Sequence, residues 1–219
     1  MRALRGSAIL FDMDGTLVDS NEASEVTWQS WASAHRVAID RIRAVHHGRR
    51  PEETIALVAP HLNAQEEARA IYRAQEHMFA GIHPIAGAKQ FFESVPRGRA
   101  AIVTAATRAI LCLRLRIVGL RPPPVCVTGD MLKAGKPDPE GYLEAAQRLG
   151  VAPSECIVFE DAPAGLLAAH RAGMQSVAIL TNYTERQLRQ ELGAEVAPMA
   201  FLPNLVQLEY RDGSVSLPT

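Results

Sequence analysis

Two carboxylates stand directly after a short apolar run near the start of the chain. Residues 8–11, Ala-Ile-Leu-Phe, predict a buried strand, and Asp12 and Asp14 follow it, with Gly15 able to turn the chain. Acids this close repel each other unless a cation or a shared proton lies between them. The pattern indicates a charged site at the carboxyl end of a strand, where open α/β sheets bind ligands. Taken alone, it is equally compatible with a solvated turn.

Polar groups also follow the next predicted strand, residues 100–103. The hydroxyl of Thr104 comes first, and the backbone N–H groups of Ala105 and its neighbours stand at the start of a predicted helix. A hydroxyl beside free N–H groups at a helix start favours an anion. Thr104 alone is also a plausible helix cap.

The two later strands contribute one cation and two more acids. Lys136 lies in a Gly-Lys-Pro-Asp-Pro loop after the third strand, and Glu160 and Asp161 follow the fourth. Carboxylate and carbonyl oxygens are the ligands that Mg²⁺ prefers. We therefore expect Mg²⁺ to offset the repulsion between the acids, with Lys136 and Thr104 holding a phosphate.

The elements that must position these residues alternate between strand and helix from residue 84 onward. Short β-branched strands separated by amphipathic helices predict a parallel sheet of about five strands with helices on both faces. Residues 19–83 instead show only helical patterns. We predict an α/β fold: a three-layer Rossmannoid core formed by residues 1–18 and 84–219, with a helical cap inserted at 19–83. Residues 207–210 and 214–217 flank Asp-Gly and predict a small hairpin.

Composition narrows the partners and the compartment. The 219 residues carry 23 Lys and Arg against 24 Asp and Glu, which argues against nucleic acid or an anionic membrane as a partner. No apolar stretch approaches the roughly 20 residues that span a bilayer. The three cysteines lie far apart in apolar contexts and suit reduced thiols, so we expect a cytoplasmic protein. We expect either a monomer or a small homo-oligomer.

Taken in order, the four polar segments resemble the four motifs of the haloacid dehalogenase superfamily. The motifs are Asp12-Met-Asp14-Gly-Thr16-Leu-Val-Asp19-Ser20, Val-Thr104, Gly-Lys136-Pro-Asp-Pro and Glu160-Asp161-Ala-Pro-Ala-Gly165. The helical insertion is similar to the first cap class of that superfamily. The whole chain is most similar to its sugar phosphatases, those related to 2-deoxyglucose-6-phosphate and glycerol phosphatases. One departure is Thr104-Ala105-Ala106, where relatives often carry a small polar residue or asparagine after the threonine.

The resemblance implies a two-step mechanism. Asp12 attacks phosphorus to form an aspartyl-phosphate, which divides one hard substitution into two easier ones. Asp14 protonates the leaving alcohol and then deprotonates the water that hydrolyses the intermediate. Thr16 is expected to orient Asp14.

The resemblance also implies the ligands of the metal and of the phosphate. Mg²⁺ is expected on Asp12, the backbone carbonyl of Asp14 and Asp161, with Glu160 nearby. The transferring phosphoryl group is expected on Thr104, the N–H of Ala105 and Lys136.

The predicted cap contains a basic turn, His46-His47-Gly48-Arg49-Arg50. The resemblance suggests that such a turn reaches the substrate, so His47 and Arg49 are candidate specificity residues; an exposed basic loop is the alternative. Trp28 and Trp31 lie three residues apart, a spacing that suits the cap core better than a sugar-stacking platform. We predict that the cap opens and closes about residues 18–20 and 82–84.

These patterns predict a Mg²⁺-dependent phosphatase for a small phosphorylated metabolite, a sugar or polyol phosphate. A phosphohexose mutase of the β-phosphoglucomutase type shares all four motifs and stays open as an alternative. A phospho-accepting signalling domain without turnover is a remote one, because such a domain needs an exposed face rather than a lid. A dehalogenase is disfavoured by Asp14, since relatives that cleave carbon–halogen bonds lack an acid there.

Overall fold

The centre of the molecule is a parallel sheet of six strands. The computed structural model describes residues 3–217, and its sheet has the order β6-β5-β2-β7-β8-β9. The strands are β2 (Ala8–Phe11), β5 (Ala100–Val103), β6 (Val125–Val127), β7 (Cys156–Glu160), β8 (Gln175–Ile179) and β9 (Ala200–Leu202). All neighbours pair in parallel, and the first strand, β2, lies between β5 and β7. The α/β prediction is confirmed, with one strand, β9, more than expected.

Helices cover both faces of this sheet, as the continuous apolar strands require. One face packs on α5 and α6 through a core that includes Phe11, Phe91 and Ile110. The opposite face packs on α7 and α8 through Leu10, Tyr142 and neighbouring alanines. The helices of this part are α5 (Ala88–Ser94), α6 (Arg108–Ile117), α7 (Glu140–Leu149), α8 (Pro163–Arg171) and α9 (Glu185–Leu192), with short 3₁₀ turns η1 (Arg97–Arg99), η2 (Gly129–Met131) and η3 (Pro153–Glu155).

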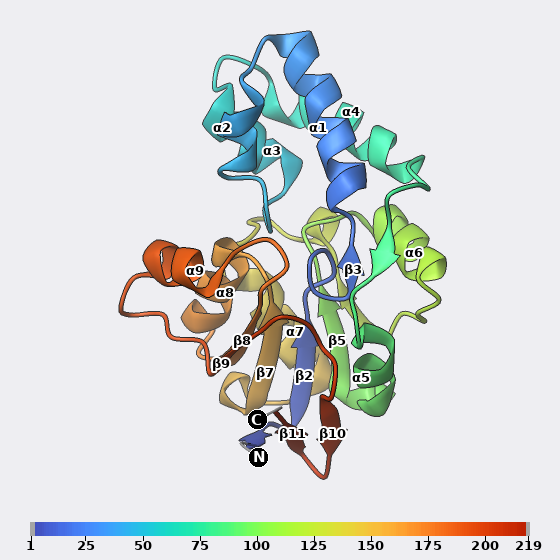
Figure 1. Cartoon of the computed structure of the whole chain (residues 1–219), viewed down its shortest axis with the longest axis vertical. Coiled ribbons are helices and arrows are strands. Elements are labelled where there is room, and N and C mark those ends of the chain that lie inside the picture. The colour runs from blue at the N-terminus through green and yellow to red at the C-terminus, as the bar shows by residue number, and fades with distance from the viewer. Residues whose placement is uncertain (1–2, 218–219) are drawn as a thin grey trace.

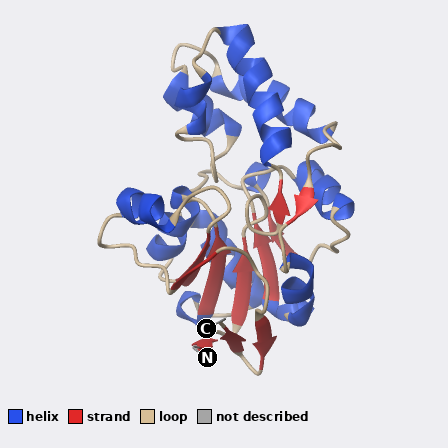
Figure 2. Cartoon of the chain, viewed as in Figure 1, coloured by secondary structure: helices blue, strands red, loops and turns tan. Residues whose placement is uncertain are grey.

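The four helices that follow the first strand form a second body above the sheet (Figures 1 and 2). They are α1 (Asn21–His35), α2 (Ile39–Arg43), α3 (Pro51–Val58) and α4 (Ala64–Glu76). Trp28 and Trp31 pack edge to face with ring centroids 5.8 Å apart, and both are buried in a core separate from that of the sheet. We propose that these helices are the cap predicted at 19–83.

The chain crosses between the two bodies at one place. β3 (Val18–Asp19) pairs antiparallel with β4 (His83–Pro84), so the outgoing and returning segments are hydrogen-bonded to each other. The sequence showed no strand pattern here, because each strand has only two residues. This ribbon coincides with the predicted linkers, and cap movement about it stays a prediction.

Residues 209–216 form a hairpin at the lower end of the molecule as drawn in Figure 1. β10 (Glu209–Arg211) and β11 (Ser214–Ser216) form the expected hairpin, and Asp212 and Gly213 both have positive φ, as a tight two-residue turn between twisted strands requires. β1 (Ala3–Arg5), which the sequence did not suggest, pairs with β11. Within residues 3–217, no helix is long and apolar enough to cross a membrane.

Candidate active site

The buried ion pair between Asp12 and Lys136 lies at the carboxyl end of the central strand. Asp12 follows β2, and its Oδ1 lies 2.5 Å from Lys136 Nζ, which also donates to Glu160 Oε1 at 2.6 Å. All three side chains are at most 6% exposed. Tyr142 of α7 completes the packing, with its ring centroid 5.3 Å from the ammonium and its hydroxyl 3.4 Å from Glu160 Oε1. The ammonium is thus fixed between two carboxylates.

Two glycines let the surrounding loops approach these acids. A Cβ at Gly165, near the start of α8, would overlap the carboxylate of Glu160, which also accepts the N–H of Ala162 at 2.7 Å. A Cβ at Gly15 would overlap the carboxylate of Asp161, and Gly15 has a φ of +84° that disfavours other residues. Any larger residue at Gly15 or Gly165 would collide with a buried carboxylate, which explains why each acidic motif contains a glycine.

The acidic cluster suits a hard divalent cation. Asp12, Glu160 and Asp161 each place a carboxylate oxygen within 4.8 Å of the others, and all three are buried. Asp161 Oδ2 accepts a hydrogen bond from Asn182 at 2.6 Å, whereas its buried Oδ1 has no partner among residues 3–217. An orphaned carboxylate oxygen beside other carboxylates is the donor set that Mg²⁺ favours. The side chain of Asp14 is not in this cluster.

Burial governs the protonation of these acids in the metal-free chain. It raises the pKa of Asp12 to about 8, against the lowering effect of Lys136 and with a further increase from Glu160 and Asp14. Burial, followed by the charges of Glu160 and Asp12, raises the pKa of Asp161 well above its ordinary value. Burial opposes the charged form of Lys136, but Asp12 and Glu160 raise its pKa well above the ordinary range. The single charge of Lys136 therefore does not balance the three carboxyl groups.

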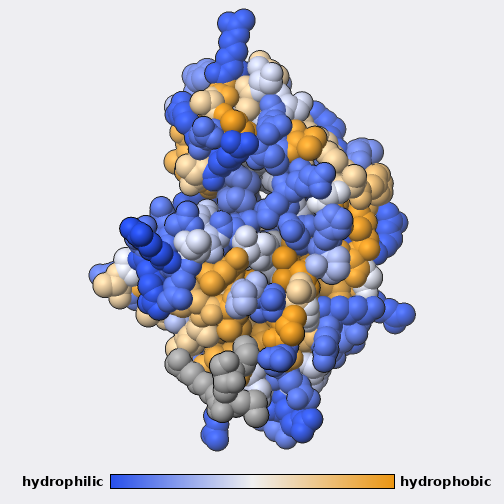
Figure 3. Space-filling view, in the orientation of Figure 1, coloured by the Kyte–Doolittle hydropathy of each residue, from blue (hydrophilic) through white to orange (hydrophobic). Residues whose placement is uncertain are grey.

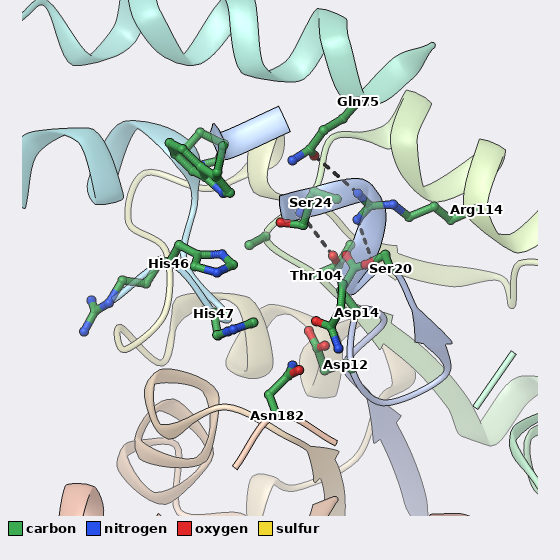
Figure 4. Close-up of a pocket in the computed structure, with 18 of the residues that line it drawn as sticks. Asp12, Asp14, Ser20, Ser24, His46, His47, Gln75, Thr104, Arg114 and Asn182 are labelled. Atoms are coloured by element: carbon green, nitrogen blue, oxygen red, sulfur yellow. Dashed lines mark hydrogen bonds and ion pairs between the residues drawn. The ribbon is translucent and has the colours of Figure 1, made fainter. Parts of the chain in front are cut away.

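Asp14 lies beside Asp12 in the wall of the cavity and is held through one oxygen (Figure 4). Its Oδ1 lies 2.7 Å from the Ser20 hydroxyl and 2.6 Å from Nη1 of Arg114 on α6. The buried Thr16 hydroxyl has no hydrogen-bond partner in the described part of the chain, so it does not hold Asp14 by a hydrogen bond here; that Thr16 orients Asp14 stays a prediction. The Ser20 side chain makes no cap bond to α1, and Asp19 Oδ1 accepts the N–H of Asn21 at the start of that helix.

Thr104 and Ala105 lie where the second motif predicts, after β5 and against the same cavity. Thr104 Oγ1 accepts the N–H of Ala106 at 3.0 Å, and the Thr104 N–H donates to Val127 at 3.0 Å. The carbonyl of Ala105 is packed so closely on Gly129 that a Cβ there would overlap it. This packing fixes the loop that faces the carboxylates.

The basic turn of the cap reaches the same cavity. His47 and Arg49 line it together with Asp12 and Asn182. Gly48, between them, has a φ of +73°, and a Cβ there would lie 2.9 Å from Cβ of Ala162. The structure therefore brings both predicted cap residues to the site.

The cavity itself has a volume of about 80 Å³ and lies where the helical body meets the sheet. Hydrophilic residues predominate on the surface along this junction (Figure 3). Trp28 is buried in the cap core, and one side of it also lines the cavity. Burial lowers the pKa of His46 to about 3 and also lowers that of His47, so both rings are neutral near pH 7.

A second contact joins the cap to the loop that carries Lys136. Arg50, at the start of α3, donates to the carbonyls of Leu132 and Lys133 at 3.1 and 3.2 Å. Glu53 Oε1 accepts from Arg50 Nη2 at 2.6 Å and from the N–H of Gly135 at 2.8 Å. The Arg50–Glu53 pair therefore fixes the backbone next to Lys136.

Four parts of the site were not predicted from the sequence: Arg114, Asn182, Tyr142 and the Arg50–Glu53 pair. Arg114 and Tyr142 lie inside helices whose pattern indicates only amphipathic packing, and Asn182 lies in an ordinary polar loop after β8. For the Arg50–Glu53 pair, the sequence contained one signal: the i,i+3 spacing at the start of a helix, which allows the two side chains to meet.

Comparisons with known proteins identify a family and several named relatives. Residues 9–179 match the family described as haloacid dehalogenase-like hydrolase. The chain is 38% identical to hexitol phosphatase A of Escherichia coli over 184 residues, covering 80% of this chain and 84% of that protein. It is 35% identical to validoxylamine A 7'-phosphate phosphatase of Streptomyces hygroscopicus over 190 residues, covering 83% of this chain and 89% of that protein.

A solved structure with the same fold is β-phosphoglucomutase from Clostridium difficile, with a TM-score of 0.72, 20% identity and 93% of each chain covered. The predicted resemblance to hydrolases of this superfamily, and to its phosphatases, is confirmed by these matches. With the family match spanning most of the chain, the protein belongs to the haloacid dehalogenase-like hydrolase family.

Proposed function

We propose that the protein is a Mg²⁺-dependent phosphatase that hydrolyses the phosphate monoester of a small sugar or polyol through an aspartyl-phosphate. The observation that carries this proposal is the buried cluster at the end of β2. There Asp12 contacts Lys136 within a group of three carboxylates, and Asp14 stands beside it. The named phosphatases among its relatives support the same reaction.

The residues of the cluster fit a Mg²⁺ ion. Asp12 and Asp161 would hold it, together with the backbone carbonyl of Asp14, as the family resemblance implies. The orphaned Oδ1 of Asp161 supports this assignment. When bound, Mg²⁺ supplies positive charge that stabilises the charge developing on the phosphoryl oxygens.

The two steps follow from the positions of two aspartates. A carboxylate oxygen of Asp12 attacks phosphorus, the bond from phosphorus to the substrate oxygen breaks, and that oxygen keeps the electron pair and takes the proton of Asp14. Water then attacks the phosphorus of the aspartyl-phosphate and gives a proton to Asp14. The bond to Asp12 breaks, and inorganic phosphate leaves.

Lys136 and Thr104 would stabilise the transferring group. The ammonium already lies 2.5 Å from the nucleophilic carboxylate, so a phosphoryl group on Asp12 would lie next to it. Glu160 fixes this ammonium by its own contact of 2.6 Å, which makes it a positioning residue for Lys136. The Thr104 hydroxyl and the N–H of Ala105 would donate to the phosphoryl oxygens.

The cavity between cap and core favours a small, neutral, hydroxylated leaving group. Its cap side offers hydrogen-bonding groups from Asn21, Ser24 and Tyr72, together with His47. Such groups match the hydroxyls of a polyol or sugar. The modest size of the cavity, about 80 Å³, supports a small leaving group.

Phosphorus NMR tests the proposal. The protein is incubated with hexitol, hexose, deoxyhexose and glycerol phosphates, with Mg²⁺ or with a chelator, and Asp12→Asn is the control. We expect Mg²⁺-dependent growth of inorganic phosphate that is absent in the variant. Conversion of one sugar phosphate into another with little free phosphate would establish a mutase instead. Turnover by Asp12→Asn would contradict the assigned nucleophile.

A further inference from the structure

Arg114 is a buried cation that the two-step mechanism above does not use. It lies in α6, its side chain is 5% exposed, and its Nη1 is 2.6 Å from Oδ1 of Asp14. Its Nη2 faces Oε1 of Gln75 at 3.4 Å, and Gln75 belongs to the cap helix α4. Figure 4 shows the three side chains in a row from the cap to the nucleophile.

The pairing of this buried cation is incomplete. Burying a guanidinium is costly unless each of its donors is paired, and Nε of Arg114 has no partner within the described range 3–217. An unpaired donor on a buried charge is typical of a residue kept for what it contacts. Here the one carboxylate in contact is Asp14, whose side chain is 30% exposed and lines the cavity.

The contacts on Asp14 determine where its other oxygen points. Arg114 and the Ser20 hydroxyl both approach Oδ1, at 2.6 and 2.7 Å. A carboxylate held through one oxygen by two donors on its outer side keeps the second oxygen toward the substrate. Proton transfer needs the acid within hydrogen-bond reach of the leaving oxygen, so this orientation matters for the first step.

We propose that Arg114 is a positioning residue for Asp14 and that Gln75 couples this positioning to cap closure. The inference rests on the proposed function, since it concerns the acid of that reaction. The cap helix α4 packs against α6, so Gln75 reaches Arg114 in the arrangement described here. Opening about the β3–β4 ribbon would withdraw Gln75 and leave Arg114 with fewer partners. Asp14 is then fully oriented only beneath a closed cap.

The choice of leaving group separates positioning of the acid from a general structural role. A polyol leaves as a strongly basic alkoxide and needs the proton of Asp14, whereas nitrophenolate is a stable anion that does not. Single turnovers measured by rapid quench, with glycerol or hexitol phosphate and with p-nitrophenyl phosphate, report the first step for each. The variants are Arg114→Met and Gln75→Leu, and the control is Arg116→Met, an exposed arginine on the same helix.

We expect the first step with the polyol phosphate to slow by at least about tenfold in Arg114→Met and by a smaller factor in Gln75→Leu. With p-nitrophenyl phosphate the same variants should stay within about threefold of the parent. The Arg116→Met control should match the parent with both substrates. The double variant should be no slower than Arg114→Met, because Gln75 acts through Arg114.

Equal losses with both substrates, or no loss with either, would overturn the inference. Thermal unfolding shows whether Arg114→Met is folded. If it is not, the test uses Arg114→Lys and Gln75→Leu instead. Arg114→Lys should then recover part of the polyol-specific rate. Failure of the proposed function looks different, because the parent protein would then release no phosphate from either substrate with Mg²⁺.

Discussion

Replacing Asp12 by asparagine should change how the stability of the metal-free protein depends on pH. Burial raises the pKa of Asp12 from 3.8 to about 8 in the folded chain, whereas in the unfolded chain the group titrates near its ordinary value. Between these values the folded state holds a proton that the unfolded state has lost. Stability from this group is therefore complete at low pH and is lost as pH rises toward 8.

The size of the effect follows from the proton count. One extra proton bound by the folded state lowers the free energy of unfolding by about 1.4 kcal/mol for each unit of pH. From pH 5 to pH 7.5 the loss due to Asp12 amounts to about 3 kcal/mol. The asparagine side chain of the variant does not titrate, so this contribution disappears while the rest of the pH dependence stays nearly the same.

Urea unfolding in the presence of a chelator, at several pH values, measures this difference directly. The free energies of unfolding of parent and Asp12→Asn should diverge with pH in favour of the variant. Asp130→Asn, at an exposed position, should parallel the parent. Adding Mg²⁺ should remove most of the parent's decline, because the cation takes the place of the proton. Parallel curves for parent and Asp12→Asn would refute the reasoning that burial outweighs Lys136.

Three further variants test other contacts. Lys136→Met should lower kcat by at least about a hundredfold. Lys133→Met, at an exposed position on the same loop, should leave kcat unchanged. Similar rates for the two variants would contradict the role of the buried ammonium. Gly48→Ala places a Cβ in a left-handed conformation against the core, which costs about 1–2 kcal/mol and should raise KM in steady-state assays. Gly98→Ala, with open space around it, is its control. Arg50→Met should raise KM and increase hydrogen exchange in the loop at residues 129–135, and unchanged exchange would contradict the clamp.

The sheet was largely predictable because its signals are local. Apolar runs of four or five residues followed by polar motifs indicate buried parallel strands, and each predicted strand lies in the sheet. β9 has only three residues, and β1 becomes a strand only by pairing with β11, more than 200 residues later. Short strands of this kind depend on tertiary pairing and leave no pattern in the sequence.

The acidic motifs were also visible in the sequence, but their supporting contacts were not. Asp12 and Lys136 are joined because parallel strands bring their carboxyl ends to one edge. Arg114 lies in the middle of a helix, where an arginine is ordinary, and its contacts with Asp14 and Gln75 arise only from tertiary packing. The Thr16 hydroxyl, which its motif position suggested as a support for Asp14, has no hydrogen-bond partner in the described part of the chain. The assigned roles of the site residues stay predictions.

The β3–β4 ribbon has a consequence for how specificity can change. Because Val18 and Pro84 are paired partners, the helical insertion leaves and rejoins the core at adjacent points. An insertion with adjacent ends behaves as a cassette, which can be lengthened, shortened or exchanged without stretching the sheet beneath it. The helical insertion and the sheet that carries the acidic cluster are then separable segments, so the residues that the insertion contributes to the cavity can change without altering the sheet.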